Sequence, residues 1–92
     1  GASDLTPVAV TTTYLVTVTV DDGVVTHYGE WIYVTELRKY IACNLETGVA
    51  SFLAPNGTYN VVGSNDTQDL VGRATDVVVN GAAMPDVTIT IA

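Results

Sequence analysis

The feature that most constrains this chain is an alternation of β-branched residues with a period of two. In the segment 14–20, one face carries Tyr14, Val16, Val18 and Val20, and mainly threonines occupy the positions between them. Successive side chains of a β-strand point to opposite faces, so this pattern predicts a strand with one buried face. Residues 87–91 alternate in the same way and predict a second such strand.

Five further segments have the composition or the alternation of strands: 31–35, 40–44, 49–54, 58–62 and 76–79. Glycine, asparagine and aspartate residues separate these segments at intervals typical of antiparallel sandwiches. Residues 69–75 fit either a short helical turn or an irregular strand. We therefore expect an all-β fold, an antiparallel β-sandwich of about seven strands.

The sequence Pro55-Asn56-Gly57 predicts a hairpin turn between two of these strands. In that turn Gly57 would supply a positive φ angle. Phe52 and Tyr59 would then stack on each other in the core from adjacent antiparallel strands. Gly48 would similarly allow a tight turn before the strand 49–54.

The run from Asn44 to Val61 resembles a known pattern: a polar turn, then Gly48, Ala50, Phe52, Pro55, Gly57, Tyr59 and Val61 at fixed spacing. This pattern is similar to that of transthyretin-like β-sandwich modules, which include carboxypeptidase regulatory-like domains and the Cna-B-type repeats of Gram-positive surface proteins. The resemblance implies an Ig-like sandwich that serves as one module of a larger protein. Many Cna-B-type domains carry a Lys–Asn isopeptide bond, but the segment 14–20 has no lysine, so we expect none here.

The chain has 92 residues, which corresponds to one domain. We expect residues 1–12 to be a linker that begins with a tag remnant, Gly-Ala-Ser, and residues 13–92 to form the sandwich. The net charge of −7 disfavours nucleic acid and anionic membranes as partners, since both require clustered Lys and Arg. No apolar run approaches the roughly 20 residues of a membrane-spanning helix, so membrane insertion is not expected.

No residue pattern points to catalysis, and we expect no enzyme activity and no cofactor. His27 lies in a short polar link, and Cys43 fits a small apolar position in a strand. One cysteine and one histidine cannot form a structural zinc site. Calcium binds oxygen ligands, for which the candidates are Asp21 with Asp22 and the group Asn65, Asp66 and Asp69. The second group is closely spaced, but it has no glycine and no bidentate glutamate at the right distance. The alternative is a solvated acidic loop.

The candidate ligand-binding residues are Trp31 and Tyr33. If Ile32 and Val34 face the core, these two aromatic rings face outward on one sheet. We expect a structural spacer or adhesive module of a larger protein outside the cell, at a cell surface or on a virion, with neighbouring domains as its partners. The alternatives are a module that binds a glycan or a protein through Trp31 and Tyr33, and an accessory domain of a secreted hydrolase.

Overall fold

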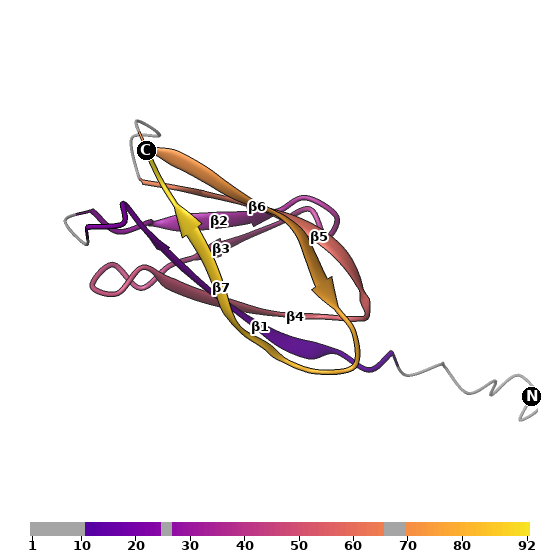
Figure 1. Ribbon diagram of the computed structural model, residues 1–92. Coiled ribbons are helices and arrows are strands. Elements are labelled where there is room, and N and C mark those ends of the chain that lie inside the picture. Colours follow the sequence, from indigo (N-terminus) through magenta and orange to yellow (C-terminus); the bar gives the residue numbers. More distant parts are fainter. Residues whose placement is uncertain (1–10, 25–26, 66–69) are drawn as a thin grey trace, which may run out of the picture.

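The computed structural model describes residues 11–24, 27–65 and 70–92, and these residues form two packed β-sheets (Figure 1). The predicted all-β sandwich is confirmed. Within the described residues, no helix is long and apolar enough to cross a membrane. The predicted linker lies mostly outside this part of the chain. The strands are β1 (Tyr14–Asp21), β2 (Trp31–Val34), β3 (Lys39–Ala42), β4 (Val49–Ala54), β5 (Gly57–Ser64), β6 (Val71–Val79) and β7 (Met84–Thr90).

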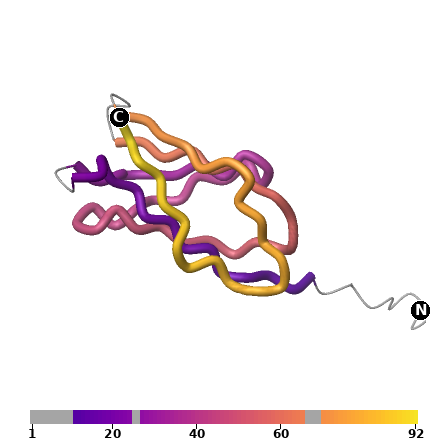
Figure 2. The backbone as a smooth tube through the Cα atoms, viewed as in Figure 1, coloured from indigo at the N-terminus to yellow at the C-terminus, as the bar shows by residue number. Residues whose placement is uncertain are grey.

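One sheet has the order β4-β1-β7 and the other has the order β3-β2-β5-β6. Strand pairs within the sheets are antiparallel, with the exception of β1 and β7, which are parallel neighbours. Parallel neighbours run in the same direction, so β1 begins at the end of the sandwich at which β7 begins. Figure 2 shows that the loop between β6 and β7 lies beside the start of β1.

The core between the sheets contains the apolar faces that the alternation predicts. Val16, Val18 and Val20 of β1 are fully buried, and they face Ile32 and Val34 from the opposite sheet within one cluster. The β-branched side chains restrict their own rotamers and pack well on a pleated surface. The remaining buried members of this cluster are Cys43, Ala50, Phe52, Ala54, Tyr59, Val61, Val77, Val79, Ile89 and Ile91.

The predicted hairpin at Pro55-Asn56-Gly57 is wrong. β4 belongs to the three-stranded sheet and β5 to the four-stranded sheet, so this connection passes from one sheet to the other. Phe52 and Tyr59 are both buried, but they lie on strands of different sheets. The prediction failed because a turn sequence shows where the chain reverses and not which strand becomes its hydrogen-bonded neighbour.

Gly57 also differs from the prediction, since it is not among the glycines with positive φ. It opens β5 opposite Val79, and the Tyr59 ring lies beside it. A Cβ atom at this position would stand 3.2 Å from the Tyr59 hydroxyl oxygen, which donates a 2.6 Å hydrogen bond to the Pro55 carbonyl. Glycine therefore leaves room for the Tyr59 ring.

Strand β6 is longer than the predicted segment 76–79 and begins at Val71. Its register shifts between the Tyr59–Val77 and Val61–Ala74 pairs, and Asp76 has a φ of 56° there. This extra residue interrupts the alternation. The open choice for residues 69–75 is thus resolved as a strand from Val71 onward.

Candidate functional site

The outer face of the four-stranded sheet carries a cluster of three rings, Trp31, Tyr33 and Tyr40, which we call the aromatic cluster. Trp31 and Tyr33 alternate with the buried Ile32 and Val34 of β2, as predicted. Tyr40 projects from β3 directly opposite Tyr33. The ring centroids of Tyr33 and Tyr40 are 4.5 Å apart, and those of Trp31 and Tyr40 are 5.5 Å apart in an edge-to-face arrangement.

The rings of the aromatic cluster pack on one another and do not form a flat platform. The Trp31 and Tyr40 ring planes meet at 66°, and those of Tyr33 and Tyr40 meet at 45°. Tyr40 is 69% exposed, whereas Trp31 and Tyr33 are partly covered. Part of the aromatic surface therefore shields the sheet, and Tyr40 is its most accessible ring.

The outer face of the four-stranded sheet continues from the aromatic cluster onto β5 and β6. Val62 lies opposite Tyr33, and the exposed Arg73 lies opposite Val62. Residues directly opposite on neighbouring strands share one face of the sheet. This row thus places aromatic, apolar and cationic side chains side by side.

A polar pair borders the aromatic cluster where β2 ends. The Glu36 carboxylate accepts hydrogen bonds from the Asn60 backbone N–H at 2.7 Å and from the Asn60 side-chain amide at 2.8 Å. These hydrogen bonds lower the pKa of Glu36, the one to the backbone N–H being the largest cause. The carboxylate is consequently ionised at neutral pH and fixed in orientation, although it lies at the surface.

The calcium candidates are only partly within the described residues. Asp66 and Asp69 lie outside them. The Asn65 side-chain oxygen accepts a hydrogen bond from the Leu70 N–H at 3.1 Å. Within the residues that the structure describes, no three His, Cys, Asp or Glu side chains gather as metal ligands.

The other calcium candidates, Asp21 and Asp22, hold the turn that follows β1. Asp21 Oδ1 accepts from the Gly23 N–H, and Asp22 accepts from the N–H groups of Val24 and His27. His27 Nδ1 also lies 3.1 Å from Asp22 Oδ2. These carboxylates therefore act as acceptors for backbone groups, as aspartate often does in turns.

An open pocket of about 470 Å³ lies at the end of the sandwich where β7 ends. Its described walls contain the Asp22–His27 pair and no serine, threonine, cysteine or lysine. Among these described lining residues, His27 thus has no hydroxyl, thiol or amine nucleophile beside it. The lining residues are Asp22, His27, Asn65, Leu70, Ile91 and Ala92.

Cys43 occupies a small apolar position, as predicted. Its side chain is 6% exposed and belongs to the core. Burial raises the pKa of the Cys43 thiol to about 11. The reactive thiolate form is therefore scarce at neutral pH.

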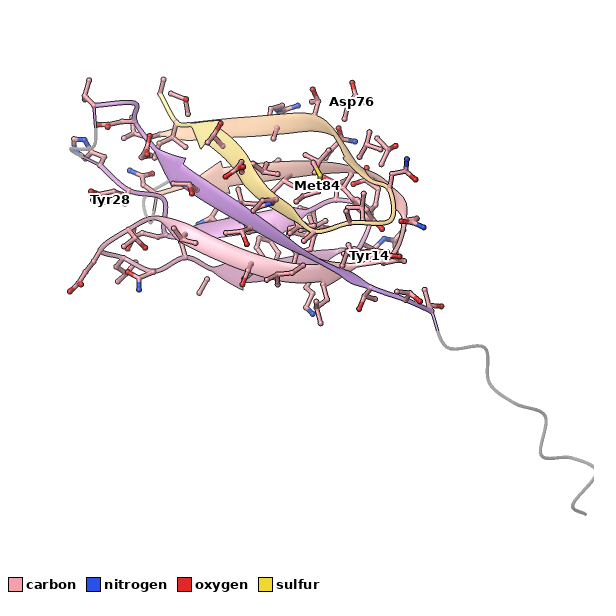
Figure 3. The ribbon with its side chains drawn as sticks, turned by 60° about the horizontal axis from the view of Figure 1, so that its bottom comes forward. Tyr14, Tyr28, Asp76 and Met84 are labelled. Carbon is pink, nitrogen blue, oxygen red and sulfur yellow. The ribbon has the colours of Figure 1, made fainter. Side chains whose placement is uncertain are left out.

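Sequence reasoning did not identify Tyr40 or the Glu36–Asn60 pair as parts of this face. Tyr40 lies in a segment without clear alternation, so its direction could not be read from the sequence. Glu36 and Asn60 meet only because β2 and β5 are neighbours. Tyr28, which is close in sequence, pairs with Asp21 and lies toward one end of the molecule (Figure 3).

Comparison with known proteins adds no identification. No protein-family model matches the chain, and no curated protein and no solved structure matches it either.

Proposed function

We propose that this domain is a non-catalytic spacer, a module that holds the parts of a larger extracellular protein apart. One observation carries the proposal: the first and last strands are parallel neighbours. The chain therefore enters the sandwich at one end and leaves it at the other. Figure 3 agrees, because Tyr14 and Met84 lie toward one end and Tyr28 toward the opposite end.

The distance between the entry and exit points of the chain follows from the length of β1. The eight residues of β1 extend over about 26 Å at roughly 3.3 Å per residue. The point at which the chain enters β1 and the point at which it leaves β7 are therefore held about this far apart. The resemblance to transthyretin-like modules of surface proteins supports the same function and an extracellular location.

Energy transfer between two dyes tests the spacing. The dyes are attached to Thr12→Cys and to a cysteine added after Ala92, and the control places the second dye at Ala82→Cys, in the loop beside the start of β1. The buried Cys43 reacts slowly under labelling conditions at neutral pH. We expect clearly lower transfer for the first pair than for the control. Equal transfer in the two proteins would contradict the spacer proposal.

A second candidate function is the binding of a soluble oligosaccharide at the aromatic cluster. The observations that favour it are the exposed Tyr40 ring and, beyond the end of β2, an acceptor of fixed orientation, the Glu36 carboxylate. Sugar rings present C–H faces to aromatic rings and hydroxyl donors to carboxylates and amides. Because the rings are inclined to one another, this face suits a single flexible sugar chain better than a flat crystalline polysaccharide.

An amide NMR titration with a pool of neutral oligosaccharides tests this second candidate. Binding predicts saturable shifts around Trp31, Tyr33 and Tyr40, and Tyr40→Ala should abolish them. Leu45→Ala is the control, since Leu45 is a similarly exposed apolar residue away from the aromatic cluster. A spectrum that does not respond, or equal responses of both variants, would count against binding here.

A further inference from the structure

We propose that the parallel pair β1–β7 gives the domain a second, mechanical function: it resists tension applied through the two ends of the sandwich. This inference rests on the spacer function proposed above, because a module that separates its neighbours lies in the path of any force between them. The chain enters at the start of β1 and leaves at the end of β7. Tension therefore pulls these two adjacent strands in opposite directions along their own axes.

The direction of the force determines how the hydrogen bonds between the strands fail. Bonds between parallel strands run across the strands, although they are slanted. A force along the strands loads the bonds of the ladder together, and they must break within one step. A force that separates the strands from one end would instead break them one after another.

The register identifies the part of the ladder that carries the load. Pairing is continuous from the Val18–Val87 pair to the Asp21–Thr90 pair, and the Ile91 N–H donates a further bond to the Asp21 carbonyl at 2.8 Å. The register shifts between Val16 and Val18, so the pairing near Met84 is interrupted. We infer that the segment after this shift is the resistant one.

Both strands are also held by the core, which opposes sliding. β1 is the central strand of its sheet and pairs with β4 on its other side. The side chains of Val18 and Val20 are fully buried, and those of Ile89 on β7 and of Ile91, directly after β7, are almost fully buried. Moving β1 along β7 would pull these side chains out of their packed positions.

Single-molecule pulling of the full chain in two geometries tests the proposal. In the first, handles are attached at Thr12→Cys and at a cysteine added after Ala92, which loads the β1–β7 ladder along the strands. In the second, they are attached at Thr12→Cys and Ala82→Cys, which separates the two strands from one end. Thermal denaturation first establishes that both proteins are folded and equally stable.

We expect the first geometry to unfold at a force about twofold higher or more at the same loading rate, because several bonds break together. Equal forces would overturn the mechanical proposal. The spacer function would stand in that case, because the energy-transfer experiment tests it independently.

A matched pair of variants locates the resistance. Ile89→Ala and Ile32→Ala each truncate a buried isoleucine, on β7 and on β2 respectively. If β1–β7 carries the load, Ile89→Ala lowers the unfolding force in the first geometry more than Ile32→Ala does, at comparable loss of thermal stability. The reverse order would place the resistance elsewhere and contradict the proposal.

Discussion

At the residue scale, two glycines with positive φ differ in their surroundings. Gly48 has a φ of 70°, and a Cβ atom there would come into collision with the Val20 carbonyl. Gly81 has a φ of 79°, and a Cβ atom there would meet no atom within 4 Å. The first position thus requires glycine for conformation and for space, and the second for conformation alone.

Alanine substitution at the two positions separates these requirements. We expect Gly81→Ala to lower the free energy of unfolding by about 1 kcal/mol, the cost of positive φ. Gly48→Ala should lower it by about 2 kcal/mol more, because the Val20 backbone must move and its hydrogen bond from the Val20 N–H to the Gly48 carbonyl is disturbed. Urea denaturation measures both values, and equal losses would refute the argument from space.

Glu36 predicts a pH dependence with a defined sign. Its pKa is lower in the folded protein than the ordinary value of 4.5, so the ionised form favours folding. This contribution is present above about pH 4.5 and disappears as the pH falls through the lowered pKa. Glu36→Gln should therefore be less stable than the native protein at pH 7, and this difference should shrink toward pH 3.

Urea denaturation of both proteins across this pH range measures the difference. Glu30→Gln serves as the control for general loss of an acidic side chain near β2. A stability gap between the native protein and Glu36→Gln that is constant with pH would contradict the assignment of the interaction to the ionised carboxylate.

At the scale of the elements, the sequence predicted the faces of the strands better than their neighbours. In β1, β2 and β4, the residues that alternate in the sequence are alternately buried and more exposed in the structure, so their buried faces could be predicted. The connection between β4 and β5 at Pro55–Gly57 passes from one sheet to the other but was predicted as a hairpin. The prediction was wrong because the same turn residues occur in connections within a sheet and between sheets. The outward direction of Trp31 and Tyr33 was readable from alternation, but their contact with Tyr40 depends on the pairing of β2 with β3.

Strand β6 shows where the periodic signal is lost. Its inward positions near the start carry Gly72 and Ala74 and not large apolar residues. A Cβ atom on Gly72 would collide with the carbonyl of Thr90 on β7. The two sheets approach so closely here that only small residues fit, and these residues carry no hydrophobic alternation.

The close approach at Gly72 gives a prediction for this corner of the sandwich. Val71 and Ala92 exchange two backbone hydrogen bonds there, at 3.4 and 3.3 Å. We expect Gly72→Ala to push β6 away from β7 and to increase the amide exchange rates of Val71 and Ala92 about tenfold or more. Gly81→Ala is the control, since a Cβ atom there would meet no atom within 4 Å, and unchanged exchange in Gly72→Ala would refute the close contact.

At the scale of the whole molecule, distant parts of the sequence meet in the sheets. β1 is the first strand in the sequence and β7 is the last, yet they are neighbours in one sheet. β2 and β5 are neighbours in the other sheet, although β3 and β4 lie between them in the sequence. Contacts between residues far apart in sequence slow folding, because the chain loses entropy before these contacts form.

We therefore expect refolding with rates of about 1 to 1,000 per second, as for other all-β domains. The single tryptophan, Trp31, reports the process by stopped-flow fluorescence. If β7 pairs with β1 only after the transition state of folding, Ile89→Ala should mainly increase the unfolding rate. The folding and unfolding rates of Ile32→Ala serve for comparison. Slower refolding of Ile89→Ala, with little change in unfolding, would instead place β7 in the folding nucleus.

The parallel pairing of β1 with β7 also has a consequence for synthesis on the ribosome. β1 is translated early, but its β7 partner follows about seventy residues later. Until then, β4 can pair with one side of β1, whereas the other side keeps unpaired N–H and C=O groups that can bind a strand of another chain. A nascent chain that pauses before Met84 thus has one unpaired edge on β1, the strand whose valines are buried in the complete domain. This strand order therefore makes such incomplete chains prone to aggregation through that edge.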